Sequence, residues 1–433
     1  MLTSPLAPLL MLVGVYILIK IKCFYILHPI KAFGRAASAL KCRKNLTAFT
    51  LALAGTLGVG NLLGVAVGIM VGGAGSLFWL FVSAIPASAI KYAEVLVSSE
   101  NGGGGIPDAA RRSFPRIGKP MSAIYALACF LLSFVMGAAL QSRSVVDSTV
   151  LTLGADRRAA AVILTLLVAV SVVGKGKHIG KITLFVIPLT TIIYIIVAIS
   201  TVAVNVSALP SVLARVISEA FTPEAGVGGV LGLLTSRAVR EGFSRGMLSN
   251  EAGAGTSSIG HTTGAAMPPA VRGLFGVLEV VFDTSVLCTL SGLAILVGLP
   301  EGAAASCGME LILSAVGQSL GAFPASLVTL SVWAFAYSTI VCWYYYGTEC
   351  FRRLVGRGCT AAVLPLFLAF VIFGSVISES VLIILADALL LVLSAITLPT
   401  LIKKSDRIVL LSESCGFLKS KESDAGEGLD SEG

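Results

Sequence analysis

Apolar stretches long enough to cross a bilayer recur along the whole chain and are separated by short polar segments. A helix needs about 20 predominantly apolar residues to cross roughly 30 Å of hydrocarbon. Counting the stretches that are bounded by charged and turn residues predicts eleven membrane helices and an all-α fold. The expected spans are residues 5–27, 48–72, 75–98, 119–150, 158–173, 179–204, 209–242, 268–299, 322–347, 361–377 and 380–402.

Two of the predicted spans are interrupted by glycines and polar residues, in AGTLGVGNLLG at 54–64 and in FTPEAGVGGVLG at 221–232. If the first span is set aside, the other ten form two sets of five with opposite orientation, and each set begins with one of these interruptions. Matched discontinuous helices in inverted repeats point to a binding site near the middle of the membrane. Close helix packing is the alternative explanation of such glycines.

Unwound backbone in the membrane interior offers both kinds of ligand that a polar cargo needs. Free N–H groups at the positive end of a half-helix suit a carboxylate, and free carbonyls suit an ammonium group or Na⁺. We therefore expect a transporter core at 45–402, with repeats at 48–205 and 209–402. An N-terminal helix with a basic loop (1–44) precedes this core, and a polar tail (403–433), expected to be disordered, follows it.

The composition and the charges fit a membrane protein with a defined orientation. The chain has 56% hydrophobic and only 12% charged residues, which is too little polar surface for a soluble globule. The net charge of +8 comes from loops, because 27 of the 31 basic residues lie in alternate loops and in the tail. The positive-inside rule then predicts a multi-pass protein of the cell membrane with its N-terminus outside and its C-terminus in the cytoplasm.

The residue pattern argues against an enzyme, a metalloprotein and a nucleic-acid-binding protein. The nine cysteines are scattered and only three histidines occur, so we expect neither a metal centre nor a disulfide framework. The chain has no G-x-S-x-G motif, and its serines have no His and Asp partners that could be paired at membrane depth. We therefore expect no catalytic residue, no organic cofactor and no nucleic acid, with the lipid bilayer as the surroundings.

Blocks spread over residues 45–402 resemble the alanine or glycine:cation symporters. The segment GVGNLLGVAVGIMVGGAGSLFWLFVSAIPASAIKYAE looks like the signature of that family. Further blocks agree in the same order. The matching segments are 58–94, QSRSVVD at 141–147, AFTPEAGVGG at 220–229, SRGMLSNEAGAGTSSIGH at 244–261, VFDTSVLCTLSGLAIL at 281–296 and FAYSTIVCWYYYGTECFRRLVG at 335–356.

The resemblance implies a fold, a cargo and a set of site residues. That family is similar to the leucine transporter class, with five plus five inverted helices and discontinuous core helices one and six, here with an extra N-terminal helix. It carries alanine or glycine with Na⁺ as the co-transported ion. The implied contacts are the N–H groups of Gly58, Val59 and Gly60 for the substrate carboxylate, the carbonyls around Phe221 and Thr222 for its amine, Gln141 as a polar contact, and Thr339 and Trp343 as the pocket wall.

The resemblance also implies a sodium site between core helices one and eight. Carbonyl and hydroxyl oxygens are hard donors that suit a hard cation. The implied ligands are the carbonyls of Ala54, Leu57 and Phe335 and the hydroxyls of Ser338 and Thr339.

Three positions stand apart from the pattern. The family typically has Thr where this chain has Val59, so the choice of substrate is open. It usually has Asn where this chain has Arg143, whose guanidinium we expect near the outer vestibule. Asp283 lies inside an apolar span, where a carboxylate is either a functional ligand for a proton or sodium, or a hydrogen-bonded brace of the helix bundle.

These observations predict sodium-coupled symport of small neutral amino acids, alanine or glycine, into the cell by alternating access. Two alternatives remain open at this point. The first is a proton-coupled or uncoupled amino-acid exchanger of the same fold. The second is a membrane receptor or scaffold that does not transport.

Overall fold

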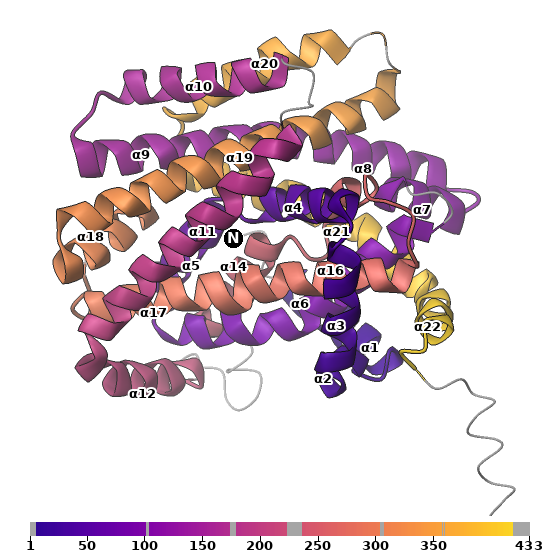
Figure 1. The fold of residues 1–433 in the computed structure, drawn as a ribbon, viewed down its shortest axis with the longest axis horizontal. Coiled ribbons are helices and arrows are strands. Elements are labelled where there is room, and N and C mark those ends of the chain that lie inside the picture. Colours follow the sequence, from indigo (N-terminus) through magenta and orange to yellow (C-terminus); the bar gives the residue numbers. More distant parts are fainter. Residues whose placement is uncertain are drawn as a thin grey trace, which may run out of the picture.

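The computed structural model describes residues 6–100, 104–173, 179–222, 236–303, 307–356, 358 and 360–418. Within these ranges every regular element is a helix, which confirms the all-α prediction (Figure 1). The elements are α1 (Leu6–Lys20), α2 (Phe24–Leu27), α3 (Pro29–Leu40), α4 (Arg43–Thr56), α5 (Gly60–Gly72), α6 (Gly75–Ser99), α7 (Gly105–Ser113), α8 (Gly118–Leu132), η2 (Ser133–Leu140), α9 (Gln141–Leu153), α10 (Arg157–Val173), α11 (Ile179–Val204), η3 (Val206–Ala208), α12 (Leu209–Ala220), α14 (Arg237–Asn250), α15 (Ser257–His261), α16 (Pro269–Val280), η4 (Val281–Cys288), α17 (Thr289–Gly298), α18 (Gly308–Leu320), α19 (Ala322–Val355), η5 (Thr360–Ala362), α20 (Val363–Gly374), α21 (Glu379–Lys403) and α22 (Ser405–Ser414).

Seven helices in the described ranges are long and apolar enough to span a membrane, judged by length and composition. Three of these are compound: α4 with α5, α8 with η2 and α9, and α16 with η4 and α17. η2 and η4 are π-helices, which occur mostly as short bulges within α-helices and frequently at functional sites. Two further apolar helices, Pro8–Lys20 and Thr360–Gly374, are shorter, and the total of eleven spans stays a prediction.

The predicted span 209–242 is not a single helix. α12 ends at Ala220, and α14 is a separate helix that runs on to Asn250. Residues 223–235, which include most of the interruption predicted at 221–232, lie outside the described residues. A hydropathy scan does not find α14, because its sequence, RAVREGFSRGMLSN, is polar. The helix is nevertheless mostly buried, because it packs on α5 and α6.

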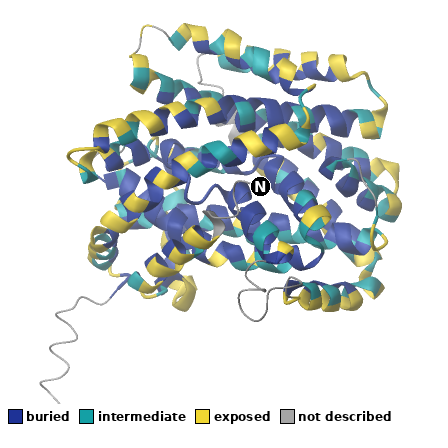
Figure 2. Cartoon of the chain, turned by 180° about the vertical axis from the view of Figure 1, so that it is seen from behind, coloured by how far each residue is buried: buried dark blue, intermediate teal, exposed yellow. Residues whose placement is uncertain are grey.

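Glycines allow α14 to lie close to α6. A Cβ atom built on Gly242 would lie 2.5 Å from the carbonyl oxygen of Ser76 and 2.6 Å from Cβ of Trp79. Small residues permit such close approach of helices in membranes, where packing drives association. Figure 2 shows the buried interior and the exposed residues on the outer helix faces. Many of the exposed side chains are large and apolar, for example Val170 at 77% and Leu12 at 68%, as expected for a surface that faces lipid.

Short helices lie at the two ends of the bundle. In Figure 1, α7 and α22 lie at the right-hand end, and α12 and α18 lie at the left-hand end. α22 corrects the expectation that the chain is disordered from residue 403 onward. The segment after it is also held, because the ring of Phe417 stacks on Phe24 with centroids 4.8 Å apart and Lys31 donates a hydrogen bond to the carbonyl of Gly416. Residues 419–433 lie outside the described residues.

We expect Gly242→Ala to destabilise the protein, because the added methyl group would collide with the backbone of α6. Overpacking of this kind costs about 1–3 kcal/mol. Thermal unfolding of the purified protein in detergent should show a lower midpoint. Gly317→Ala in α18 is the matched control, because its Cβ would meet nothing within 4 Å and alanine favours helix there. Equal midpoints for the two variants would contradict the packing of α14 on α6.

Candidate functional site

The break between α4 and α5 leaves backbone groups without their helical partners. In an unbroken helix the N–H groups of Gly58 and Val59 would donate to the carbonyls of Ala54 and Gly55, four residues back. Here Gly58 donates to a carbonyl only two residues back, at 2.8 Å, and Val59 donates to the side chain of Gln141. Two carbonyls inside the bundle therefore lose their intrahelical donors. The first predicted interruption is thus present in the structure.

Side chains of α19 take the place of the missing donors. The hydroxyl of Thr339 donates to the carbonyl of Ala54 at 2.8 Å, and Nε1 of Trp343 donates to the carbonyl of Gly55 at 3.2 Å. The Thr339 hydroxyl also lies 3.4 Å from the carbonyl oxygen of Leu57. Thr339 and Trp343 are one helical turn apart on the same face of α19, so a single helix satisfies both carbonyls.

Gln141 contacts the other face of the break. Its Oε1 accepts the Val59 N–H at 3.0 Å, and its Nε2 donates to the carbonyl of Met136 at 3.2 Å. Gln141 is the first residue of α9, directly after the π-helix η2. A Cβ atom on Gly58 would lie 3.1 Å from Oε1 of Gln141 and 3.0 Å from Oγ1 of Thr339. The side chains of two helices therefore enclose the break tightly.

The five residues predicted to bind sodium lie in two adjoining groups of oxygens. In the first group the Thr339 hydroxyl contacts the carbonyls of Ala54 and Leu57. In the second, the hydroxyl of the neighbouring Ser338 donates to the carbonyl of Phe335 at 2.9 Å. All five residues are buried. Only the first group joins α19 to the end of α4, because the contact between Ser338 and Phe335 lies within α19 itself.

Of the other residues predicted to contact the substrate, only some lie at the break between α4 and α5. Gly60 is buried and begins α5, one residue beyond Val59. Phe221 and Thr222 are not brought to the break: they are exposed at the end of α12, where Phe221 packs against Trp79 near the start of α6. The residues that follow them, 223–235, are outside the described ranges.

A second discontinuity lies between α14 and α15. α14 ends at Asn250, α15 begins at Ser257, and the segment between them is buried but not helical. Its backbone turns through left-handed conformations at Glu251 (φ 53°), Gly253 (φ 91°) and Gly255 (φ 73°). The two glycines adopt these angles without steric cost, whereas a non-glycine residue does so only where its surroundings hold it.

The two discontinuous helices lie side by side. α14 packs on α5, and α15 packs on α4, so each half of one helix meets one half of the other. The hydroxyl of Ser249, in the last turn of α14, donates to Oδ1 of Asn61 in α5 at 3.0 Å. At the other half, a Cβ atom on Gly260 would lie 3.2 Å from Cα of Ala52. The breaks are therefore adjacent within the bundle.

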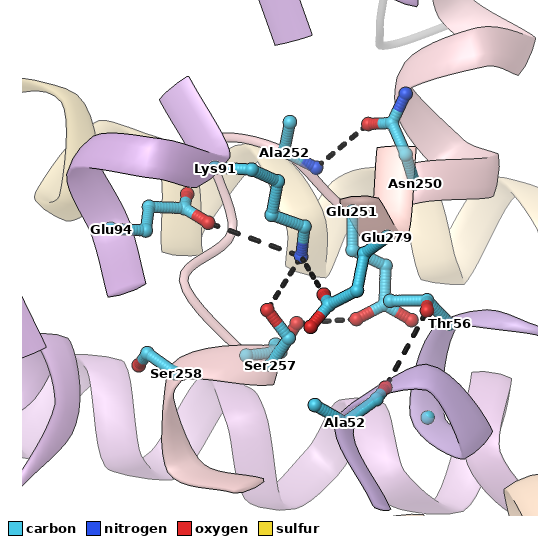
Figure 3. A network of polar contacts seen from close by, with 12 residues as sticks. Ala52, Thr56, Lys91, Glu94, Asn250, Glu251, Ala252, Ser257, Ser258 and Glu279 are labelled. Atoms are coloured by element: carbon cyan, nitrogen blue, oxygen red, sulfur yellow. Dashed lines mark hydrogen bonds and ion pairs between the residues drawn. The ribbon is translucent and has the colours of Figure 1, made fainter. Parts of the chain in front are cut away.

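A buried ionic network from α6 holds the second discontinuity (Figure 3). Oε1 of Glu94 accepts the N–H groups of Gly253 at 2.7 Å and of Gly255 at 3.0 Å. Nζ of Lys91, one turn earlier on α6, donates to the hydroxyl of Ser257 at 2.8 Å and lies 4.0 Å from the Glu94 carboxylate. A carboxylate that accepts two N–H groups makes strong, charge-assisted hydrogen bonds.

The same network reaches α16. Lys91 also lies 4.0 Å from Glu279, and Glu279 pairs with the ring of His261 at the end of α15. Glu251 accepts a hydrogen bond from the hydroxyl of Thr256, which joins the two sides of the discontinuity. These groups are all buried, so the segment is fixed by polar contacts and not by apolar packing alone.

Sequence reasoning missed the second discontinuity, although it contained a signal for it. Lys91 and Glu94 are one helical turn apart inside an apolar span, and charged residues at such a place need buried partners. The segment NEAGAGTSS at 250–258 supplies glycines and small polar residues that fit a partner of this kind.

Arg143 lies next to the site but faces away from the break. Its Nε donates to Asp147 at 2.6 Å, and its Nη1 donates to the carbonyls of Ser375 and Ile377 at 3.2 and 3.3 Å. Arg157 binds the other oxygen of Asp147 at 2.7 Å. The guanidinium therefore ties α9 to the chain segment that follows α20.

Similarity to known proteins agrees with this arrangement. A sequence model of the sodium:alanine symporter family matches residues 1–414. The chain belongs to this family. It is therefore a multi-pass membrane protein of a transporter family whose members couple amino-acid transport to a cation, and the family resemblance found in the sequence is confirmed.

Two relatives and one solved structure are similar to this chain over most of its length. An uncharacterized transporter of Haemophilus influenzae is 30% identical over 370 residues, which is 81% of this chain and 80% of the relative. The sodium/alanine symporter AgcS of Methanococcus maripaludis is 31% identical over 332 residues, or 71% of this chain and 70% of the relative. The crystal structure of MhsT in complex with L-phenylalanine has a TM-score of 0.60 at 14% identity, covering 81% of this chain and 87% of MhsT. This symporter thus has the leucine-transporter fold.

We expect Gly58→Ala to reduce uptake of labelled alanine by reconstituted vesicles about tenfold, equivalent to ~1.4 kcal/mol. The added methyl group would press on Thr339 and Gln141, the side chains that satisfy the break. Gly64→Ala on α5 is the control, because the nearest atom to its Cβ would be 3.7 Å away. If the two variants are present in the membrane in equal amounts and take up alanine equally fast, the break is not part of the transport site.

Proposed function

We propose that this chain imports small neutral amino acids, alanine or glycine, together with Na⁺ by alternating access. The observation that carries the proposal is the break at Gly58 and Val59, where side chains of α9 and α19 bind the Val59 N–H and the carbonyls of Ala54 and Gly55. Exposed peptide groups within the membrane are tolerated where they line a binding site. The family match and the sodium/alanine symporter among the relatives support the choice of cargo and ion.

The carboxylate of the substrate would bind at the Val59 N–H. In the structure Oε1 of Gln141 accepts this hydrogen bond at 3.0 Å. A neutral amide oxygen thus holds the place of a carboxylate oxygen, and a charged acceptor makes the stronger hydrogen bond. Gly58 and Gly60 leave room for the approach because they carry no side chain. Gln141 would then turn toward the bound substrate as a second polar contact.

The substrate amine requires carbonyls, and the predicted ones at Phe221 and Thr222 lie away from the break. The C-terminal end of α14 provides an alternative. The last carbonyls of a helix lack intrahelical donors and carry the negative end of its dipole, which suits an ammonium group. Ser249 brings this end into contact with Asn61, three residues after Gly58. We therefore assign the amine to the end of α14.

The walls of the site favour a small side chain. Trp343 is fully buried against η2, where a Cβ atom on Gly137 would overlap its ring. The cavity beside the break is small and is bounded by Leu57, Gly58 and the rings of Tyr194 and Phe335. The methyl group of alanine fits such a space better than a larger side chain.

Na⁺ would bind the oxygens of Ala54, Leu57, Phe335, Ser338 and Thr339. These groups belong to α4 and α19, so an ion there would fix one helix relative to the other. One Na⁺ that enters down about 100 mV gains ~2.3 kcal/mol, enough for a roughly 50-fold concentration ratio of the cargo.

The orientation follows from the positive charges. Arg353 of α19 pairs with Asp108 of α7, and Arg407 of α22 pairs with Glu100, so these basic residues gather at one end of the bundle. We assign this end, and with it the C-terminus, to the cytoplasm, and the opposite end with α12 to the outside.

Uptake of labelled alanine into vesicles tests the proposal directly. We expect accumulation when an inward Na⁺ gradient is present and little uptake when choline replaces Na⁺. A proton gradient alone should not restore the uptake. Uptake that is unchanged in choline would refute sodium coupling, and the absence of alanine counterflow would refute transport of this cargo.

Thr339→Ala should raise the Na⁺ concentration for half-maximal uptake about fivefold, the effect of losing a hydrogen-bonding oxygen worth ~1 kcal/mol. Thr339→Ser keeps the hydroxyl and should change the requirement less. The measurement is the Na⁺ dependence of alanine uptake at saturating alanine. An equal Na⁺ requirement in all three proteins would place the ion elsewhere.

A further inference from the structure

The segment that links α1 to α4 is strongly basic. Seven Lys and Arg residues lie between Lys20 and Lys44, and the first acidic residue of the chain is Glu94. α22, which packs on α1, adds two acidic residues beside this segment. These are Asp406, which pairs with Lys20 at 2.8 Å, and Glu413. The segment therefore keeps a large excess of positive charge.

Helix α3 within this segment has one face packed on protein and another that is open. Ala32 and Ala36 are buried, and the helix packs on α16, across which it runs in Figure 1. The side chains of Leu27, at the end of α2, and Ile30 are 67% and 90% exposed, although both are large and apolar. A helix that presents exposed apolar and basic side chains together is typical of the boundary between lipid headgroups and acyl chains.

A groove lies between α3, the start of α16 and the end of α22. Its lining combines one face of α3 with residues of the other two helices and includes Lys31, Gly34, Arg35, Ser38, Pro268 and Ser414. Lys31, Arg35 and Ser38 follow one another at helical spacing, so they share that face. A Cβ atom built on Gly34 would meet nothing within 4 Å, so the groove is open between the two basic residues.

The two basic side chains of the groove are held in place and keep further donors. Nζ of Lys31 donates to the carbonyl of Gly416 at 2.9 Å, and Nη1 of Arg35 donates to the carbonyl of Cys415. The Arg35 guanidinium also lies over the ring of Phe417, 4.8 Å from its centroid. Their partners in the described part of the chain are carbonyls and an aromatic ring, so neither charge is neutralised there. An ammonium and a guanidinium each have several N–H groups, which leaves donors for an anion.

Two kinds of anion are candidates for this groove, and they differ in apolar content. The first is the C-terminal segment 419–433, which follows Leu418 and carries five acidic residues but only Leu429 as a large apolar side chain. The second is a phospholipid with an anionic headgroup, which brings a phosphate for the basic groove together with acyl chains for the exposed Leu27 and Ile30. Exposed apolar side chains beside basic ones therefore favour the lipid.

We propose that the groove between α3, α16 and α22 binds the headgroup of an anionic phospholipid from the cytoplasmic leaflet. Lys31 and Arg35 would bind the phosphate, and the hydroxyl of Ser38 would donate a further hydrogen bond to it. Leu27 and Ile30 would enter the layer where the acyl chains begin. The site goes beyond the proposed transport function, because neither the cargo nor Na⁺ takes part in it. A bound lipid would hold the three helices together at the end of the bundle that we assign to the cytoplasm.

Counting of bound lipid on the full-length protein in detergent tests the site. The protein is titrated with phosphatidylglycerol and, in parallel, with zwitterionic phosphatidylcholine, and the lipid bound per chain is measured by native mass spectrometry. We expect phosphatidylglycerol to bind about tenfold more tightly, and this preference to fall as the salt concentration rises. Lys31→Gln combined with Arg35→Gln should abolish the preference. The matched control is Arg116→Gln combined with Lys119→Gln, which removes the same charges from exposed positions around the start of α8 and should keep it.

A second pair of variants guards against loss of folding, because Lys31 and Arg35 also hold the segment after α22. Gly34→Glu places a negative charge in the open part of the groove, and Gly34→Gln places a neutral side chain of similar size there. Both substitutions have room at Cβ, and both raise the helix propensity of the position. Gly34→Glu should weaken the binding of phosphatidylglycerol about tenfold, and Gly34→Gln should weaken it much less.

The outcomes decide between the lipid, the C-terminal segment and a general attraction of charges. Equal binding of the two lipids, or equal losses in the two double variants, would overturn the site, because no defined groove would then be involved. Equal effects of Gly34→Glu and Gly34→Gln would also contradict a headgroup site. If phosphatidylglycerol binds only after Gln and Asn replace the five acidic residues of 419–433, that segment is the occupant and the inference is wrong.

Alanine uptake into vesicles separates this inference from the proposed function. The lipid measurement needs neither alanine nor Na⁺, so the two results are independent. A protein that takes up alanine with Na⁺ but shows no lipid preference would overturn the lipid site alone. A protein that prefers phosphatidylglycerol but does not take up alanine would keep the lipid site and refute the proposed function.

Discussion

The structure depends on the need to satisfy backbone groups that leave a helix inside the membrane. Lipid offers no hydrogen bonds, so each freed N–H or carbonyl needs a protein partner or a ligand. At the first break α19 donates to Ala54 and Gly55, and α9 accepts from Val59. At the second, Glu94 of α6 accepts from Gly253 and Gly255. The partners of the broken helices are thus polar side chains on unbroken neighbours.

This constraint explains where the polar residues of an otherwise apolar chain lie. Gln141, Thr339 and Lys91 are buried, and each contacts a discontinuity. The π-helices η2 and η4 lie directly before Gln141 and around Asp283, where an altered helical repeat changes the direction of these side chains. A half-helix can move only if these hydrogen bonds break and others replace them. The number and strength of the bonds therefore limit how easily the broken helices move.

Much of the fold and part of the site could be predicted from the sequence. The period and length of apolar stretches located α6, α11 and α21 almost to the residue, because these helices have the composition that lipid requires. α14 could not be located in this way. Hydropathy reports contact with lipid, and α14 packs on protein through Gly242 and Gly246. The first break was found because its glycines lie inside an apolar run. The discontinuity at 250–258 was not predicted, since its buried partners are distant in sequence and only the fold brings them together. The interruption predicted at 221–232 lies mostly outside the described residues.

The two discontinuities differ in what occupies their N–H groups, and this difference favours the first as the place for a substrate carboxylate. The carboxyl group of Glu94 makes two hydrogen bonds to the backbone and lies beside Lys91, so a free carboxylate would have to displace an equivalent group that the protein holds in place. Gln141 is neutral and makes one hydrogen bond to the break. A carboxylate can replace it with a gain in hydrogen-bond strength, and the displaced amide still has the carbonyl of Met136 as a partner. We therefore propose that the break held by Glu94 is a structural support and that the break at Gln141 is the binding surface.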